Sequence, residues 1–368
     1  MEKVAFVCFN HSNRYSGGRI HALYLAKAFA KIGYEVDFYT NAKPVFYDET
    51  VSIFGDRNFN LCINKWFLWK AKSNNYKHII FPPHAARRKF AGVVDKLLIY
   101  PFICNLKKKS GAKLWLLDFE SPEWKSEVDE RVLREFKHVL PLVKEMDVIL
   151  STTKTGRDYA KKYYGRIKQD FLFKQLYLCI NSRVGDSIGY QCERKDRAVV
   201  FYRSGQMHKN NEAIFNMIKS LPSGFTLLLI GKTTKKDESF FYELRELAKS
   251  CEVKIIQEER VNEQRKYELL ATSRLLLFSS KFEGYGLPPV EAQYVGTPVV
   301  CSDLPVLREV NQHAVFVDFS NVDDLKSAII KAMDMDHKML HDAVSSFASV
   351  ESFCTNLQKI VLEIHEQQ

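Results

Sequence analysis

Short apolar runs alternate with amphipathic stretches along this chain. Val4–Phe9 is an uninterrupted apolar run of small, β-branched and aromatic residues, typical of a buried parallel strand. Arg19–Lys31 then places apolar residues at helical spacing, Gly33 ends the stretch, and Glu35–Thr40 is the next expected strand. The same alternation predicts further elements up to residue 179: strands at Lys113–Leu117, Val148–Ser151 and Gln175–Cys179, and helices at Glu127–Val143 and Lys154–Tyr164.

A polar stretch at Gln191–Arg197 interrupts the alternation, which then restarts. The expected strands after it are Ala198–Tyr202, Phe225–Ile230, Val253–Ile256, Leu275–Phe278 and Pro298–Cys301. The expected helices are Lys209–Ser220, Ser239–Lys249, Asn262–Ala271, Pro289–Val295, Asn321–Met333 and Phe353–Ile364. Repeated alternation of strand and helix predicts parallel sheets covered by helices.

We therefore expect an α/β protein with two Rossmann-like, doubly wound domains that face each other across a cleft. The first domain would comprise residues 1–190 and the second residues 191–352, and residues 353–368 would form a C-terminal helix that could pack back on the first domain. Ligands of such sheets bind outside the carboxyl ends of the strands. The loops that follow strands are accordingly where functional residues are expected.

Composition and charge indicate which classes of protein this sequence could belong to. The 368 residues are 46% hydrophobic and 27% charged, as in a soluble globular protein with two cores. The sequence lacks an apolar run of the roughly 18 residues that a membrane span needs, and its start does not have the pattern of a signal peptide. Eight scattered cysteines form no Cys-x-x-Cys pair, which favours free thiols in a reducing cytoplasm. The net charge of +10 predicts an anionic partner.

The most distinctive segment is Phe282–Ala292, with the sequence FEGYGLPPVEA. Seven residues separate Glu283 from Glu291, and Pro288 and Pro289 suit the first turn of a helix. We expect Glu283 in the loop after a strand and Glu291 in the first helical turn, where both could face a ligand. A carboxylate accepts two hydroxyl hydrogen bonds, which suits the diol of a ribose or a sugar. The alternative is a solvated Glu283 and a Glu291 stabilised by the helix dipole.

Two further segments could bind phosphate. Arg203 follows a strand and Lys209 comes six residues later, so two cations and nearby N–H groups could neutralise a diphosphate. Each of them could instead be a solvated side chain. Gly17 and Gly18 lie between the first strand and the first helix, where glycine permits close approach and helical N–H groups can bind an anion. A tight turn without a ligand would explain the pair equally well.

The stretch from Leu275 to Leu325 resembles the retaining glycosyltransferases of family 4, which have the GT-B fold. Their Glu-x7-Glu motif is spelled EGFGLPxxEA and corresponds here to Glu283–Ala292, with GTPVV and SD following at residues 296–303. Upstream, Tyr202–Lys209 is similar to the family's Gly-Arg…Lys segment, with Tyr202 in place of the glycine. Ser16–His21 is similar to its N-terminal Gly-Gly loop. The resemblance covers the second domain well and the first only thinly.

This resemblance implies a transfer of a sugar from a nucleoside diphosphate sugar, with UDP or GDP, to a hydroxyl of a glycan or lipid-linked acceptor in cell-surface polysaccharide assembly. The anomeric configuration would be retained, and neither a metal nor another cofactor is implied. The first domain would bind the acceptor and the second the donor.

The resemblance also implies roles for single residues. Arg203 and Lys209 would hold the diphosphate, Glu291 the ribose hydroxyls, and Gly17 and Gly18 would lie against the phosphate or the acceptor. The transferred sugar would be held by the loop before the helix: Glu283 and the backbone of Tyr285, Gly286 and Leu287.

One departure concerns the first domain. Many family members carry a histidine after the strand that corresponds to Lys113–Leu117, where this chain reads LDFESP. Asp118 or Glu120 could stabilise developing positive charge there or orient the acceptor hydroxyl. Either could also be an ordinary acid at a strand end. The missing histidine leaves open a non-catalytic nucleotide-sugar-binding subunit, and the basic charge leaves open a DNA-base glycosyltransferase, although nucleic acid is not the expected partner.

Residues 64–113 are basic and aromatic, with KWFLWK at 65–70, RRK at 87–89 and KKK at 107–109. Lysines interleaved with Trp and Phe suit the interface of an anionic membrane. We therefore expect a cytoplasmic enzyme that could dock peripherally on the inner leaflet. The alternative is a core of aromatic residues beneath a solvated basic face.

Overall fold

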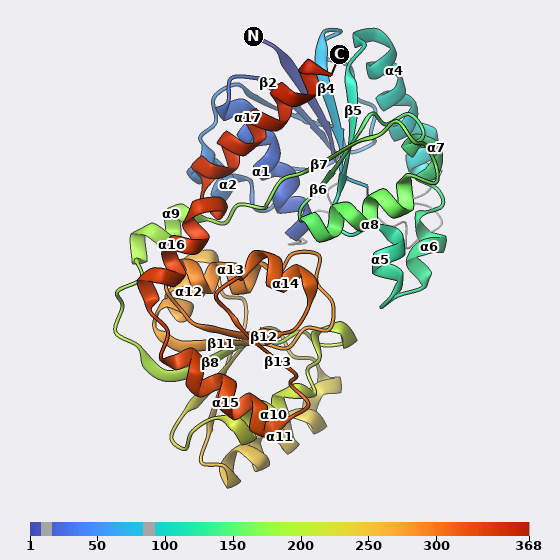
Figure 1. The fold of residues 1–368 in the computed structure, drawn as a ribbon. Helices are drawn as coiled ribbons and strands as arrows, with labels where there is room; N and C mark the ends of the chain where they lie inside the picture. Colours follow the sequence, from blue (N-terminus) through green and yellow to red (C-terminus); the bar gives the residue numbers. More distant parts are fainter. Residues whose placement is uncertain (9–16, 84–92, 368) are drawn as a thin grey trace. The chain divides into compact units, whose positions relative to one another are not determined.

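The computed structural model describes residues 1–8, 17–83 and 93–367, and its contacts divide the chain into two units. Unit 1 is Met1–Cys179 with Val350–Gln368, and unit 2 is Ile180–Ser349 (Figure 1). Unit 2 therefore begins earlier than the boundary expected at 190/191. The reason is helix α9 (Ser182–Ile188), which packs on α12 and α13 of unit 2, where a Cβ on Gly185 would lie 2.6 Å from the Tyr294 ring.

Unit 1 contains a seven-stranded parallel sheet with the order β3-β2-β1-β4-β5-β6-β7. Its strands are β1 (Lys3–Val7), β2 (Glu35–Thr40), β3 (Phe59–Ile63), β4 (Tyr76–Phe81), β5 (Lys113–Asp118), β6 (Val148–Ser151) and β7 (Leu172–Gln175). The strand expected at Gln175–Cys179 is wrong, because the partner strand β6 ends at Ser151, which pairs with Gln175. The chain adds strands outward from β1 on one side and from β4 on the other, so the topological switch point lies between β1 and β4.

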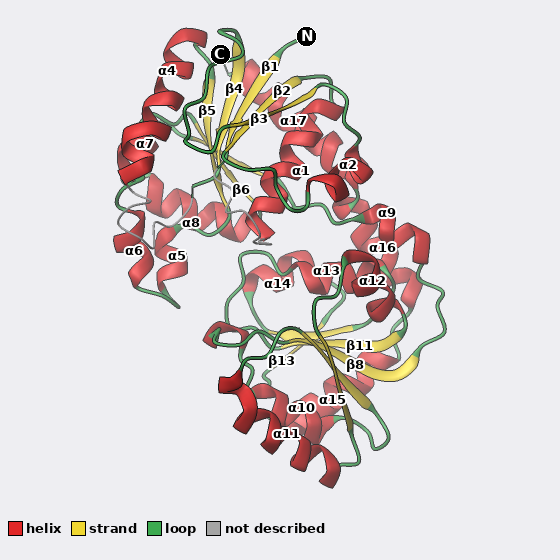
Figure 2. Ribbon diagram, turned by 180° about the vertical axis from the view of Figure 1, so that it is seen from behind, coloured by secondary structure: helices red, strands yellow, loops and turns green. Residues whose placement is uncertain are grey.

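Helices cover both faces of this sheet (Figures 1 and 2). They are α1 (Gly17–Lys31), α2 (Tyr47–Phe54), the π-helical η1 (Asp95–Ile99), α4 (Tyr100–Ser110), α5 (Pro122–Ser126), α6 (Arg131–Phe136), α7 (Leu140–Val143), α8 (Lys154–Tyr164) and α17 (Val350–Glu366). The single helix expected at Glu127–Val143 is wrong. Short helices replace it, and Pro141, which has no N–H, lies at the start of the last of them. The C-terminal helix α17 packs on α1 and contributes to the core of unit 1.

Unit 2 contains a six-stranded parallel sheet with the order β10-β9-β8-β11-β12-β13. Its strands are β8 (Lys195–Phe201), β9 (Thr226–Ile230), β10 (Lys254–Glu258), β11 (Ser273–Phe278), β12 (Val299–Ser302) and β13 (Val315–Val317). The chain winds outward from β8 in one direction and from β11 in the other. The loops that follow β8 and β11 therefore flank the switch point, where ligands of doubly wound sheets bind.

The helices of unit 2 also cover both faces of its sheet. One face carries α12 (Glu263–Ala271), α13 (Leu287–Tyr294) and α14 (Pro305–Val310), and the other carries α10 (Ala213–Ser220), α11 (Glu238–Ser250) and α15 (Val322–Met333) (Figures 1 and 2). The helix α16 (His337–Ala348) packs on α13, and the 3₁₀ turns η2 (Met207–Lys209) and η3 (Lys235–Asp237) follow β8 and β9. The α/β class with two doubly wound sheets is thus confirmed.

One helix of unit 2 begins later in the chain than predicted, which changes the surroundings of Lys209. A helix was expected from Lys209, but α10 begins at Ala213. Lys209 lies in η2 instead, and Asn210 ends that turn with a left-handed φ of 52°. The six residues after Arg203 consequently form a turn at the strand end, not the first turn of a helix.

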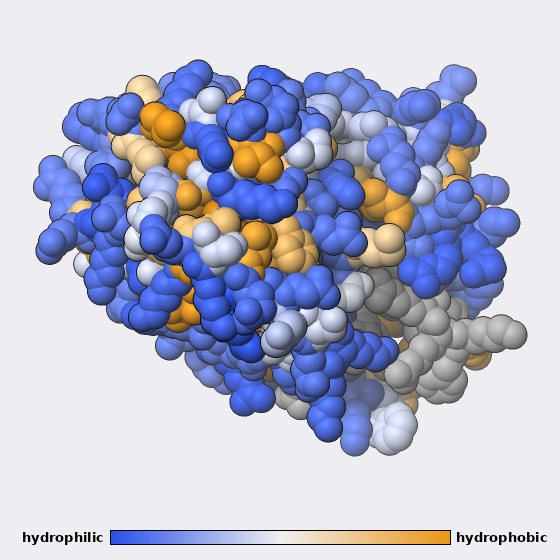
Figure 3. Space-filling model, turned by 90° about the horizontal axis from the view of Figure 1, so that it is seen from below, coloured by the Kyte–Doolittle hydropathy of each residue, from blue (hydrophilic) through white to orange (hydrophobic). Residues whose placement is uncertain are grey.

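Two observations concern a possible interaction with membranes. Within the described ranges, no helix combines the length and apolar character that crossing a bilayer requires. The face in Figure 3 is mostly hydrophilic, and its apolar patches are separated by polar side chains.

Candidate functional site

The loops after β8 and β11 are joined by an ion pair between two residues that the sequence singles out. Lys209 in η2 pairs with Glu283 in the loop after β11, and the exposed fractions of the two side chains are 22% and 13%. The Lys209 ammonium also lies 5.6 Å from the centre of the Phe278 ring. The Lys281 N–H donates to the His208 carbonyl at 2.7 Å, which ties the loops together a second time. The structure thus brings Lys209 and Glu283 together at the switch point.

The loop after β11 depends on Gly286. This residue precedes α13 with φ 88° and ψ 58°, a left-handed conformation that favours glycine. A Cβ at this position would also overlap Leu307 Cδ2, so a side chain would require Leu307 to move. Pro288 and Pro289 then occupy the first helical turn, as predicted. Because the two prolines have no N–H group, Leu287 is the only one of the first three residues of this helix that can offer one to a ligand.

Glu291 lies deeper than expected. Because α13 begins at Leu287, Glu291 is its fifth residue, and its predicted place in the first turn is wrong. Its side chain is 8% exposed, and its Oε1 lies 2.8 Å from the Nζ of Lys266 on α12. Lys266 also pairs with Glu263 at 2.7 Å. Sequence reasoning missed Lys266 and Glu263, and the only signal for them was their spacing of three in a predicted helix.

Arg203 and Tyr202 belong to the same edge of the sheet. The Arg203 side chain is exposed, and its carbonyl accepts a hydrogen bond from Asn211 Nδ2 at 3.0 Å. Tyr202, which stands where the related family has glycine, is buried and packs its ring on Phe241 of α11 at 5.2 Å. The tyrosine ring is thus accommodated by α11. The binding roles of Arg203, Tyr285 and Leu287 stay predictions.

In unit 1, Gly18 lies against the loop after β5. A Cβ on Gly18 would lie 3.3 Å from the Phe119 ring, whereas a Cβ on Gly17 would meet nothing within 4 Å. Gly18 therefore packs directly beside Asp118–Glu120. Residues 9–16, which precede the glycine pair, are outside the described residues.

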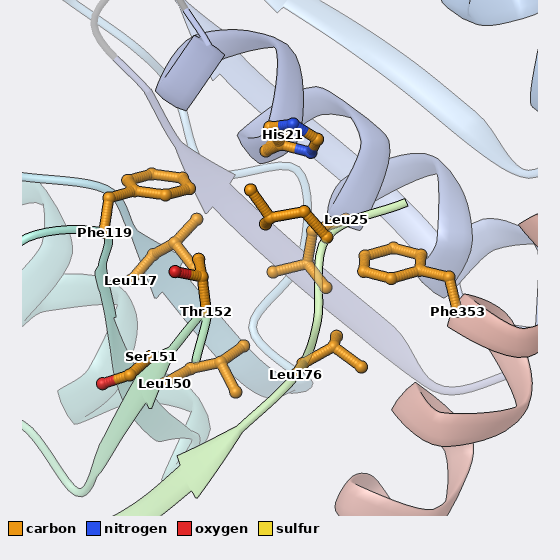
Figure 4. Close-up of a pocket in the computed structure, with 10 residues that line it drawn as sticks. His21, Leu25, Leu117, Phe119, Leu150, Ser151, Thr152, Leu176 and Phe353 are labelled. Carbon is orange, nitrogen blue, oxygen red and sulfur yellow. The ribbon is translucent and has the colours of Figure 1, made fainter. Parts of the chain in front are cut away.

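A small cavity lies next to this contact, between α1 and the ends of β5 and β6 (Figure 4). Figure 4 shows His21, Leu25, Phe119, Thr152 and Phe353 around it. Its volume is about 10 Å³, roughly enough for one water molecule. This cavity does not hold a sugar or a nucleotide.

The two carboxylates at the end of β5, Asp118 and Glu120, have different surroundings. Asp118 is 3% exposed, and the Tyr164 hydroxyl of α8 donates to its Oδ1 at 3.0 Å. Burial raises the pKa of Asp118 to about 7, although the Tyr164 hydrogen bond opposes the shift. Asp118 Oδ2 is buried and has no hydrogen-bond partner among the residues that the structure describes. Glu120, by contrast, is half-buried and pairs with Lys125.

No group of three or more His, Cys, Asp or Glu side chains in the described ranges is arranged to hold a metal ion. Asp336, part of the sequence Asp334-Met335-Asp336, instead caps α16 by accepting the Met339 N–H at 2.7 Å.

Comparisons with known proteins agree with this arrangement. Residues 190–346 match the family described as glycosyl transferases group 1. The O-antigen chain mannosyltransferase RfbU of Salmonella typhimurium is 26% identical over 215 residues, 58% of this chain and 57% of RfbU. The serotype-specific mannosyltransferase WbdA of Escherichia coli is 29% identical over 123 residues, 33% of this chain and 15% of WbdA. These matches thus span little more than half of one relative and a small part of the other.

Solved structures match over the whole chain. Sucrose-phosphate synthase from Thermosynechococcus elongatus superposes with a TM-score of 0.69 at 13% identity and covers 100% of both chains. The Anabaena protein HepE, in complex with UDP and glucose, superposes with a TM-score of 0.64 at 13% identity and covers 99% of this chain and 100% of that one. At these identities the likeness shows the fold. This chain therefore has the GT-B fold, and its residues 190–346 match the family of glycosyl transferases group 1.

Proposed function

We propose that this enzyme is a retaining, metal-independent hexosyltransferase that moves a sugar from a UDP- or GDP-linked donor to a hydroxyl of a glycan or lipid-linked acceptor in cell-surface polysaccharide assembly. The observation that carries this proposal is the group of charges at the carboxyl edge of the second sheet. There, Lys209 and Glu283 pair across the two central loops, and Glu291 occupies the following helix. The names of RfbU and WbdA support a surface glycan as the product.

Each charge has a function in the proposed donor site. Lys209 and Arg203 neutralise the diphosphate, which accumulates negative charge as the sugar leaves. The Leu287 N–H at the start of α13 adds a partial positive charge, and Gly286 lets the donor approach the backbone. When Lys209 is shared with the phosphates, Glu283 can accept hydrogen bonds from sugar hydroxyls. Glu291 accepts hydrogen bonds from the ribose.

On the acceptor side we assign the role in orienting the hydroxyl to Glu120. Its half-buried carboxylate is accessible, whereas Asp118 is enclosed and bound by Tyr164. Gly17 and Gly18 are proposed to lie next to the acceptor or the phosphate, since Gly18 packs beside Phe119. Asp118 then acts on the stability of unit 1.

A binding panel tests the donor site. UDP-, GDP-, ADP- and dTDP-sugars are each added to the wild type, to Glu291→Ala and to Glu246→Ala, which removes a half-exposed glutamate on α11. A ligand at about 100 times its dissociation constant adds roughly 2.7 kcal/mol to the stability of the state that binds it. We expect one nucleotide to raise the melting temperature of the wild type and of Glu246→Ala by several degrees and to leave Glu291→Ala unshifted. If none of the nucleotide sugars raises the melting temperature of the folded wild type, the proposal is contradicted.

We further propose that unit 1 docks on an anionic leaflet at the cytoplasmic side of a membrane. The loop after β3 packs on α4 through Trp69, whose ring lies 5.4 Å from that of Phe102. The segments that contain Trp69 and Phe102 also carry exposed apolar side chains, with Trp66 70%, Leu68 64% and Leu97 69% exposed. The basic-aromatic face comprises Lys65, Trp66, Leu68, Lys70, Lys96, Leu97, Lys108 and Lys109. Lys107 pairs with Asp147 at 3.0 Å, and residues 87–89 lie outside the described residues.

Vesicle binding tests this face. Each lysine near an anionic surface contributes about 1 kcal/mol. The double variant Lys108→Glu/Lys109→Glu is therefore expected to bind phosphatidylglycerol vesicles more than tenfold more weakly than the wild type at low salt. Lys235→Glu/Lys236→Glu makes the same charge change on exposed lysines of unit 2 and should bind like the wild type. Equal binding by both double variants, or none by the wild type, would show that the face does not dock.

A further inference from the structure

We propose that Lys266 is a positioning residue for the donor nucleotide: it anchors one oxygen of Glu291 and leaves the other directed at the ribose hydroxyls. This inference rests on the proposed donor site and adds a residue to it. The Glu-x7-Glu motif does not include Lys266, which lies 25 residues before Glu291 in the chain.

The topology brings Lys266 to the carboxyl edge of the sheet. Helix α12 starts after β10 and α13 starts after β11, so the first turns of both helices lie at the edge where the strands end. The two helices pack side by side. Lys266 extends from the first turns of α12 to Glu291 on α13, with 2.8 Å between Nζ and Oε1.

Lys266 is held from two sides. Its Nζ lies 2.7 Å from Glu263 Oε1, and the exposed fractions of the Lys266 and Glu263 side chains are 14% and 15%. The ammonium also lies 5.2 Å from the centre of the Tyr267 ring. Enclosing one ammonium and two carboxylates costs desolvation free energy that their attraction need not recover. An enclosed triad of this kind is therefore better explained by what it does to Glu291 than by a gain in stability.

The contact with Lys266 gives the two oxygens of the Glu291 carboxylate different roles. Oε1 accepts from the ammonium, whereas Oε2 has no hydrogen bond within the described part of the chain and is not enclosed. An ionised carboxylate only accepts hydrogen bonds, and each oxygen has two lone pairs. Glu291 fixed through Oε1 can thus accept two hydrogen bonds from hydroxyl groups through Oε2, which is the pattern that a ribose diol offers.

Lys266 favours the ionised form of Glu291, whose pKa lies above its ordinary value. Burial raises the pKa of Glu291 and Glu263 raises it further, whereas the neighbouring ammonium lowers it. Burial would lower the pKa of Lys266, but Glu291 and Glu263 outweigh burial and raise it, so the ammonium persists. Without Lys266, Glu291 would be a buried carboxyl beside a carboxylate and would take up a proton. A protonated Glu291 would lose acceptor capacity at the site of the diol.

The test compares nucleotides with and without the ribose hydroxyls. UDP, GDP and their 2′,3′-dideoxy counterparts are titrated calorimetrically into the wild type, Lys266→Met, Lys266→Arg and Lys249→Met. Lys249 is the matched control, because it forms an i,i+3 pair with Glu246 on α11. For the nucleotide that binds, we expect the wild type to bind the ribose form about tenfold or more tightly than the dideoxy form. This is the size of effect that losing hydrogen bonds to a charged group produces. Lys249→Met should show the same preference.

In Lys266→Met this preference should fall to less than about twofold at pH 7. It should recover as the pH is raised and Glu291 ionises, whereas the preference of the wild type, in which Lys266 lowers the pKa of Glu291, should depend less on pH. Lys266→Arg should keep most of the preference, since it retains the charge. A residue that only stabilises the fold would change neither the ratio of the two affinities nor its pH dependence.

Failure of the inference and failure of the proposed function are distinguishable. If the wild type binds neither UDP nor GDP, the donor site itself is wrong. If the wild type prefers the ribose form and Lys266→Met keeps that preference at pH 7, the positioning role is overturned. If the wild type binds both forms equally, Glu291 does not contact the diol and the inference also fails. Should Lys266→Met not fold, Lys266→Gln replaces it with the same expected loss and recovery.

Discussion

Lys209→Met is expected to slow sugar transfer by roughly 10²–10³-fold without unfolding the enzyme. Lys209 is the only cation among the described residues that pairs with Glu283, at the point where the proposed diphosphate leaves. Removing the ammonium takes away one of the two cations that are proposed to neutralise the departing charge, and it leaves Glu283, 13% exposed, without its ion pair. Steady-state release of the nucleoside diphosphate, measured with the donor that the binding panel identifies, gives the change in kcat/KM.

Lys219→Met is the control for this substitution. It removes an exposed lysine from α10 of the same unit and should leave kcat/KM unchanged. Turnover of Lys209→Met within about threefold of the wild type would mean that Lys209 does not stabilise the leaving group.

Asp118→Asn is expected to raise the stability of unit 1 at pH 8 by about 2–4 kcal/mol and to change it little near pH 4. The folded pKa of about 7 lies roughly three pH units above the ordinary value of 3.8, and the full difference corresponds to about 4 kcal/mol. Below pH 4 the carboxyl is protonated in both states. Between pH 4 and pH 7 only the folded state holds the proton, so the stability of the wild type falls as the pH rises. Asparagine keeps an oxygen acceptor for Tyr164 and abolishes this loss.

Thermal unfolding of both proteins from pH 4 to pH 8 measures the effect, with the transition of unit 1 followed separately from that of unit 2. Asp158→Asn, a change at a largely exposed carboxylate of α8, should unfold like the wild type at each pH. If Asp118→Asn and the wild type keep the same dependence on pH, Asp118 is ionised in the folded protein. Retained sugar transfer by Asp118→Asn would further support the assignment of the acceptor role to Glu120.

Local patterns predicted most of the elements that the structure contains. The bounds of β2 and α8 agree with the pattern, because uninterrupted strand and helix periodicities define them. Strand β4 escaped prediction because Lys77 and His78 interrupt its apolar pattern. His78 is nevertheless fully buried, since Trp115 Nε1 donates to its Nδ1 at 3.2 Å and its Nε2 lies 3.2 Å from His365 Nε2. Those partners are distant in the sequence, so no local pattern indicates them.

In the candidate site, too, local features could be predicted and contacts between distant parts of the sequence could not. The sequence predicted Glu283, Lys209 and Gly286 because their spacing around strand ends is a local feature. Lys266 could not be predicted, because its importance depends on the packing of α12 against α13. The enclosure of Asp118 likewise depends on Tyr164 of α8, which lies 46 residues away in the sequence.

Hydrogen exchange with and without the bound nucleoside diphosphate sugar tests the location of the donor site most directly. The site predicts slower exchange of backbone amides in peptides that cover 202–211 and 281–291, the segments that contain η2 and the start of α13. Exchange in α4 (Tyr100–Ser110) should stay unchanged, because this helix packs on β4 in unit 1. Binding that calorimetry detects, but that leaves exchange in both segments unchanged, would contradict a donor site at the ends of β8 and β11.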